Sequence, residues 1–288
     1  MRLITILSVL FSVLVPLLHA QKMDAYTIFT SKGKKTSYKK MLSSAKKNEM
    51  IFFGEFHNNP IDHWLQLELT KGLYAEFGNQ FNLSFEMFEA DQQVYLTKYL
   101  YGMFDEKQFT ESTKLWSNYK TDYAPIVDFA KTNKVFCLAA NIPRRFASLL
   151  YKQGLDSLKK LPESDLQMIA PLNDFVVDTT LSQYEALLGG EKHSGGMRML
   201  QAQAIKDATM AHFILQNKKD DQVYLHLNGA YHTDYYQGII WYIKRKKPEM
   251  KIMSISTVEQ ASTKTLDKEF LGKADFIICV PETMTKTH

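Results

Sequence analysis

The stretch MIFFGEFH, residues 50–57, is an apolar run that stops at a glycine, a glutamate and a histidine. A run this short and this apolar is typical of a strand buried on both faces of a parallel sheet. We expect a strand over 50–56. Five more runs rich in β-branched and aromatic residues predict further strands, over 81–88, 134–140, 222–227, 251–256 and 275–280.

The segments between these runs have the apolar spacing of amphipathic helices. Such segments lie at about 61–77, 90–101, 123–132, 144–151, 197–216 and 234–246, and Asn59-Pro60 supplies a helix cap and start before the first. Strands that alternate with helices predict an α/β fold, a mostly parallel central sheet with helices on both faces. Prolines and paired glycines interrupt residues 152–196, so we expect a helical insertion or cap there within a single domain, residues 21–288.

Composition excludes several broad classes of protein. The 288 residues carry a net charge of +4, and 45% of them are hydrophobic, which is enough to fill a core and too much for a disordered or collagen-like chain. The basic residues gather only in the short cluster 244–247. We therefore expect no nucleic acid as the main ligand.

The first twenty residues have the layout of a secretory signal peptide. Arg2 precedes an apolar run over 3–18, and His19-Ala20-Gln21 offers a small residue at the cleavage point. We expect residues 1–20 to be removed after Ala20 and the protein to be exported to the periplasm, although an uncleaved segment would serve as a membrane anchor. Gln21 stands where a bacterial lipid anchor would require a cysteine.

Polar side chains follow four of the predicted strands. They are Glu55 and His57 after the first strand, Glu86 in the second, Arg144 and Arg145 after the third, and His232 after the fourth. Ligands of parallel sheets bind at the carboxyl ends of the strands, so these side chains should meet at one rim.

Two kinds of chemistry suit this rim. His57, Glu86 and His232 are a suitable ligand set for a divalent transition metal with an open position for water. Without metal, the same residues together with Glu55 would act as a general acid and base. Structural roles are also open, because Glu55 could bond a helix amino terminus and Glu86 could be satisfied by Arg144 or Arg145.

At these positions the sequence resembles the ChaN-like family of haem-binding uptake proteins, of the Tiki and TraB superfamily. The ordered motifs that carry the resemblance are 54–57 with His63 and Gln66, 85–88 with Gln92 or Gln93 and 99–102, 123–125, 140–144, Ala202-Gln203 with Asp207, Met210 and Ala211, and 228–232.

The resemblance implies an exported haem-binding protein of iron acquisition, in some members a homodimer with two stacked haems and tyrosine on the iron. It also implies an outer-membrane haem or iron transport system as a partner. Tyr151 is our candidate iron ligand, because it follows the predicted rim by one or two helical turns. Arg144, Arg145 and Arg198 are candidates for the propionates. His193 is a further candidate for haem binding, and it lies in a glycine-rich loop that suits either a lid or an ordinary surface turn.

The Tiki branch implies an alternative. There, two Gly-x-x-His elements and a glutamate form a metal-dependent protease site, and His57, His232 and Glu86 match those positions by motif, with Glu55 as a further ligand or base. A metal-dependent hydrolase is therefore the second hypothesis. A scaffold protein with an inactive cleft is the third, because fold does not fix activity.

Overall fold

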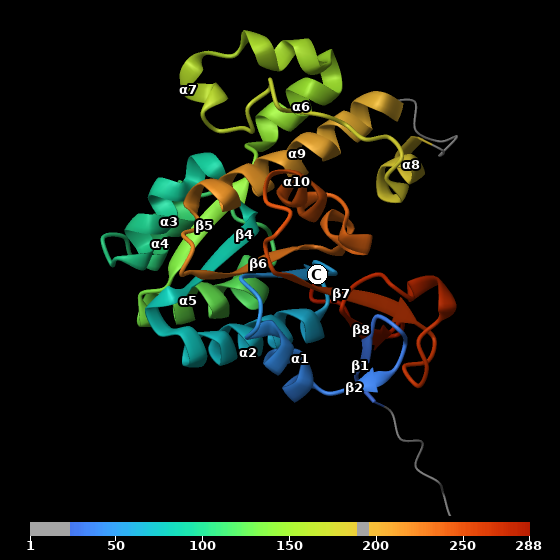
Figure 1. The fold of residues 1–288 in the computed structure, drawn as a ribbon. Coiled ribbons are helices and arrows are strands. Elements are labelled where there is room, and N and C mark those ends of the chain that lie inside the picture. The colour runs from blue at the N-terminus through green and yellow to red at the C-terminus, as the bar shows by residue number, and fades with distance from the viewer. Residues whose placement is uncertain (1–23, 189–195) are drawn as a thin grey trace, which may run out of the picture.

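The computed structural model describes residues 24–188 and 196–288 (Figure 1). The predicted signal segment and His193 lie outside the described residues. Within them, no helix combines the length and the apolar character that a membrane span requires.

The described chain forms one eight-stranded sheet with the order β2-β1-β8-β7-β3-β6-β4-β5. The six strands from β8 to β5 run parallel, and β1 pairs antiparallel with both β8 and β2. The strands are β1 (Thr27–Thr30), β2 (Lys35–Thr36), β3 (Met50–Glu55), β4 (Phe81–Glu89), β5 (Phe136–Asn141), β6 (Val223–Gly229), β7 (Ile252–Gln260) and β8 (Phe276–Pro281). All six predicted strands are present, and the predicted fold class is confirmed.

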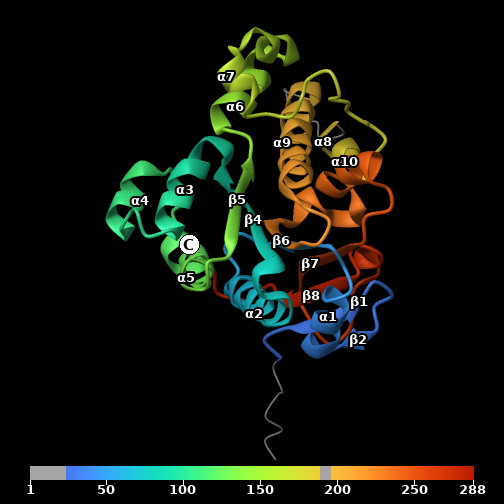
Figure 2. The same ribbon diagram turned by 60° about the vertical axis from the view of Figure 1, so that its left-hand side comes forward.

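Helices cover both faces of the sheet (Figure 2). One layer holds α1 (Tyr38–Ala45), α2 (Pro60–Phe77), α3 (Gln93–Leu100), α4 (Glu106–Ser112) and α5 (Ala124–Asn133). The opposite layer holds α6 (Arg144–Gln153), α9 (Gly196–Asn217) and α10 (Ile239–Lys246). Alternate residues of each strand face the two layers. In β3, for example, Ile51 and Phe53 join the first core, and Met50 and Phe52 join the second.

The start of α2 fixes the direction in which the chain leaves β3. The Asn59 side chain accepts a hydrogen bond from the Ile61 amide at 3.0 Å, and Pro60 occupies the first turn of the helix. Both residues are typical of a helix start. This cap turns the chain sharply after β3 and leaves the residues between strand and helix at the rim of the sheet.

Residues 152–196 form the predicted helical insertion over their described part. They include the short helices η4 (Leu155–Lys160), α7 (Glu163–Leu166) and α8 (Ser182–Leu188). Leu158 and Ile169 join the core beneath α6 and α9, while Tyr184 packs with Leu200 and Ala204 of α9. The insertion therefore packs on the helices of the second layer, and α7 lies far from the strands in Figure 1.

Candidate functional site

Three adjacent strands bring the predicted site residues to one rim. Glu55, the last residue of β3, pairs in register with Gly229, the last residue of β6. On the other side of β6, β4 carries Glu86, whose Oε2 atom accepts a hydrogen bond of 2.7 Å from the Gly229 amide. The carboxyl ends of β3, β4 and β6 thus meet as expected of parallel neighbours.

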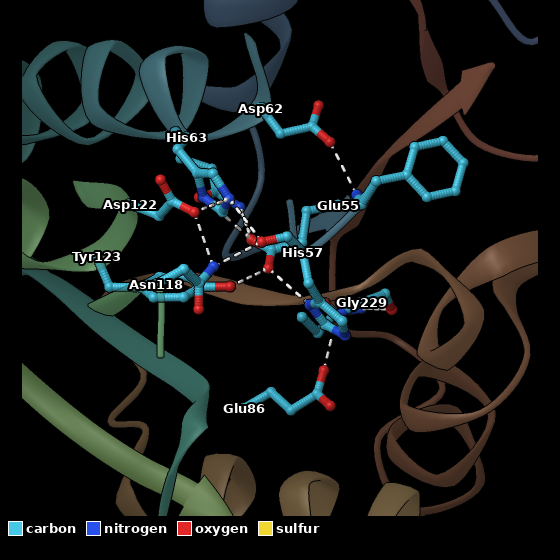
Figure 3. Close-up of polar contacts among 12 residues, drawn as sticks. Glu55, His57, Asp62, His63, Glu86, Asn118, Asp122, Tyr123 and Gly229 are labelled. Atoms are coloured by element: carbon cyan, nitrogen blue, oxygen red, sulfur yellow. Dashed lines mark hydrogen bonds and ion pairs between the residues drawn. The ribbon is translucent and has the colours of Figure 1, made fainter. Parts of the chain in front are cut away.

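Glu55 organises the first half of the site (Figure 3). Its side chain is buried, and its Oε1 atom accepts hydrogen bonds from His57 Nδ1 at 2.8 Å and from the Tyr123 hydroxyl at 2.5 Å. Gln66 donates to the other oxygen. Because the carboxylate accepts at Nδ1, His57 carries a hydrogen on that nitrogen. Its Nε2 atom has no hydrogen-bond partner in the described part of the chain.

The backbone of His57 is also held by hydrogen bonds. The His57 carbonyl oxygen accepts from Asn118 Nδ2 at 2.7 Å and from His63 Nε2 at 3.1 Å. Asn118 also donates to the buried carboxylate of Asp122 at 2.7 Å. Asp122 and Tyr123 belong to the π-helical turn η3 (Tyr119–Tyr123), and such turns often occur at functional sites. The loop that carries His57 is therefore tied to both α2 and η3.

A second polar cluster lies on the other face of the sheet. His232, in the turn η5 (Ala230–His232) after β6, is buried between two carboxylates. Its Nδ1 atom is 2.5 Å from Asp207 Oδ1, and its Nε2 atom is 3.3 Å from Glu86 Oε1. Tyr184 of the insertion donates to the other Asp207 oxygen at 2.6 Å. Glu86 is the link between this cluster and the rim that holds His57.

The charges in these clusters shift the pKa values strongly. Burial by itself would lower the pKa of His232, but the charges of Glu86 and Asp207 raise it to about 10. Burial would raise the pKa of Glu86, but the charge of His232 holds it far below its usual range. For His57, burial opposes protonation, yet the hydrogen bond with Glu55 and the charge of Glu86 raise the pKa above the ordinary value. A His57 oriented by a carboxylate in this way has the arrangement of a proton donor or acceptor.

An open cleft of about 640 Å³ lies at this rim. Glu86 and Glu89 place negative charge in its lining, and Lys114, Arg144 and Lys206 place positive charge there. The residues that line the cleft are His57, Glu86, Glu89, Lys114, Leu115, Trp116, Ser117, Asn118, Asn141, Ile142, Arg144, Lys206 and His288. Cations in this number favour a ligand that carries carboxylates or another anionic group.

The remaining candidates lie at different distances from the cleft. Arg144 lines it, whereas Arg145 is occupied by ion pairs with Asp91 and Asp165. Tyr151 is not among the lining residues. It lies two turns beyond Arg144 on α6, where Arg198 donates a hydrogen bond of 2.9 Å to the carbonyl oxygen of Lys152. The structure thus separates the candidate haem residues into a group in the cleft and a group above it.

The predicted metal ligands meet, but in a different arrangement from a metal site. Across residues 24–188 and 196–288, no three His, Cys, Asp or Glu side chains are placed to hold a metal ion together. His232 faces a carboxylate with each ring nitrogen, and one nitrogen of His57 is bonded to Glu55. His57, Glu86 and His232 thus belong to a network of hydrogen bonds and ion pairs.

Sequence reasoning missed several partners of the site residues. Tyr123, Asn118, Asp207 and Lys206 were not among the candidates, although Tyr123 and Asp207 lie within the quoted motifs. Asp207 carried the clearest signal, since it interrupts an otherwise apolar helix face that includes Ala204, Ile205, Ala208 and Ala211. A buried acid in such a face requires a partner. The sequence does not say which residue that partner is.

A family model described as "Haem-binding uptake, Tiki superfamily, ChaN" matches residues 41–243, which is more than half of the chain. The chain belongs to this family. The matched range contains both rim clusters and α6. A comparison with curated proteins gave no match.

Solved structures show that the fold is shared more widely. A ChaN of Campylobacter jejuni, described with cofacial haem, is 22% identical with a TM-score of 0.66, over 88% of this chain and 96% of that one. A Bacillus cereus protein is 12% identical with a TM-score of 0.53, over 89% and 95% of the two chains. A mutant of the erythromycin esterase EreC is 11% identical with a TM-score of 0.53, over 91% and 99%. At these identities the likeness concerns the fold alone.

Replacing Gly229 in this ChaN-family chain with alanine is expected to displace the His57 ring. A Cβ atom at this position would lie 2.8 Å from His57 Cε1 and 2.9 Å from Nε2, closer than real contacts allow. Rotation of the ring would break its hydrogen bond with Glu55, so the pKa of His57 should fall towards its ordinary value. NMR titration of the imidazole measures this shift. An unchanged titration would contradict the packing of Gly229 against His57.

Proposed function

We propose that this protein binds haem at the carboxyl-end rim of its sheet and contributes to haem or iron acquisition outside the cytoplasm. The family match over residues 41–243 carries the proposal, and the C. jejuni relative is described with haem. Export rests on the signal-like residues 1–20. Because the family resemblance implies them, the proposal also includes a homodimer and an outer-membrane transport system as partner.

The side chains above the rim fit a haem. Tyr151 is 44% exposed, and its hydroxyl has no hydrogen-bond partner among the described residues. An exposed phenol of this kind is free to bind ferric iron as a phenolate. Met197, beside Arg198 at the start of α9, is 47% exposed and adds an apolar surface. Arg198 lies close by and supplies a cation for a propionate.

Arg144 connects this surface with the cleft. It stands seven residues before Tyr151 on α6, which corresponds to about 10 Å along the same face of a helix. A planar porphyrin with propionate arms is long enough to span that separation. We propose Tyr151 as the iron ligand and Arg144 and Arg198 as propionate partners. Arg145, which is committed to two carboxylates, takes a structural role.

Titration of ferric haem into the purified protein tests this function. We expect a saturable shift of the Soret band in the wild type. Tyr151→Phe should remove the phenolate bands and weaken binding by about tenfold or more, since the iron loses its protein ligand. Tyr101→Phe is the matched control, because Tyr101 is 65% exposed and follows α3, outside the cleft and the surface above it. Absence of a saturable shift in the wild type would refute haem binding, and equal affinity in both variants would refute Tyr151 as the ligand.

A further inference from the structure

The segment Glu282–His288, here called the strap, follows β8 and crosses the rim beside the cleft. Its last residues make hydrogen bonds and an ion pair with residues near the site. The Thr287 amide donates a hydrogen bond of 2.9 Å to the carbonyl oxygen of Asn58, the neighbour of His57. Lys286 forms an ion pair with Glu259 of β7. The strap is therefore held by the sheet and by the loop that carries His57.

The Thr287 hydroxyl makes the most informative contact of the strap. It donates a hydrogen bond of 2.7 Å to Asp122 Oδ2. Asp122 is only 3% exposed, and the same oxygen accepts from Asn118, which in turn bonds the carbonyl oxygen of His57. A buried carboxylate requires donors, so Thr287 is part of the network that positions His57 and not an incidental surface contact.

This anchorage places His288 in the wall of the cleft, together with His57, Arg144 and Lys206. We propose that His288 is a ligand-binding residue of the cleft, which recognises a carboxylate of the ligand, and that Thr287 is the positioning residue that holds it there. The inference rests on the proposed function in one respect: the carboxylates are taken to be the propionates of haem. No motif of the sequence analysis includes either residue.

Haem and haem dimethyl ester, whose propionates are blocked, test the proposal as a pair of probes. We expect His288→Ala to weaken binding of haem roughly tenfold, to leave the Soret maximum unchanged and to have no effect on the ester. Thr287→Val should act in the same direction, because it keeps the shape of the side chain and removes the hydroxyl. Thr285→Val is the matched control, since Thr285 is an exposed strap residue that makes no hydrogen bond with any described residue.

The outcomes separate this proposal from the proposed function. Haem affinity unchanged in both variants, or an equal loss with the ester, would overturn the role of His288 in carboxylate recognition. Absence of haem binding in the wild type would refute the proposed function, and with it the choice of propionates. The anchorage then has its own readout, the rate at which diethyl pyrocarbonate modifies His57. That rate should rise in Thr287→Val and not in Thr285→Val, and equal rates would refute the strap as a wall of the cleft.

Discussion

Replacing His232 with alanine is expected to lower the free energy of unfolding by about 3–5 kcal/mol, the range observed when one partner of a buried ion pair is removed. His232 is 4% exposed, and its imidazole lies between Glu86 and Asp207. Its removal leaves two carboxylates without their common cation in a region that excludes water. Urea denaturation at neutral pH measures the change. His212→Ala on α9 is the control, with an expected loss below about 1 kcal/mol, because His212 has no ion pair among the described residues.

The dependence of the unfolding free energy on pH shows whether the loss in His232→Ala comes from the missing charge. The pKa of His232 in the folded protein, about 10, is above its ordinary value of 6.5. Its contribution to stability is therefore complete below pH 6.5 and is lost as the pH rises towards 10. The wild type should lose stability over that interval through this group, and His232→Ala should lack the loss. The deficit of the variant should therefore shrink as the pH rises from 6.5 towards 10, because the wild type loses the contribution that the variant lacks. A deficit that is the same at every pH would point to lost packing as its cause.

Much of the fold follows from local sequence. The six parallel strands are short, mainly apolar segments in which most residues are buried, a pattern typical of strands covered on both faces. The sequence did not predict β1 and β2, because Thr27–Thr30 buries only two side chains and Lys35–Thr36 has only two residues. β1 takes its place in the sheet by pairing with β8, near the other end of the described chain, and β2 pairs with β1 at the edge of the sheet. Such long-range pairing leaves no local signal.

The sequence predicted where the site lies, but it did not predict which residues bond to one another there. A strand that ends in Glu55, and a second that contains Glu86, must bring both acids to one edge, which the sequence indicates. The partners that decide their charge come from elsewhere. Tyr123 reaches Glu55 from η3, 68 residues further on, and Asp207 reaches His232 from α9, 25 residues before it. These two contacts are set by how the helices pack on the sheet, and no spacing in the sequence encodes them.

The two clusters at the rim differ in what they can contribute. His232 has both nitrogens engaged and is buried, so it fixes the charge of Glu86 and has no access to a ligand. The His57 side chain is 41% exposed and keeps one nitrogen without a partner in the described structure. We therefore assign His232 a structural and electrostatic role. His57, Arg144, Lys206 and His288 are among the groups that line the cleft and are available to a bound molecule.

Replacing Gly238 with alanine is expected to cost about 2–6 kcal/mol of unfolding free energy, from backbone strain together with overpacking. Gly238 precedes α10 with a φ of +53°, and a Cβ atom would lie 2.3 Å from the carbonyl oxygen of His232. The obstacle is backbone, which cannot rotate away, so the turn that holds His232 must move.

Gly272→Ala is the control for strain alone. Gly272 has a φ of +77° and open space where the Cβ atom would be placed. Thermal and urea unfolding of the two variants isolate the cost of the contact with His232. NMR of the His232 imidazole then shows whether the ion pair with Asp207 is disturbed, as we expect in Gly238→Ala alone. Equal stability of the two variants would mean that the turn after β6 tolerates displacement, and that the close approach of Gly238 to His232 does not hold the buried cluster in place.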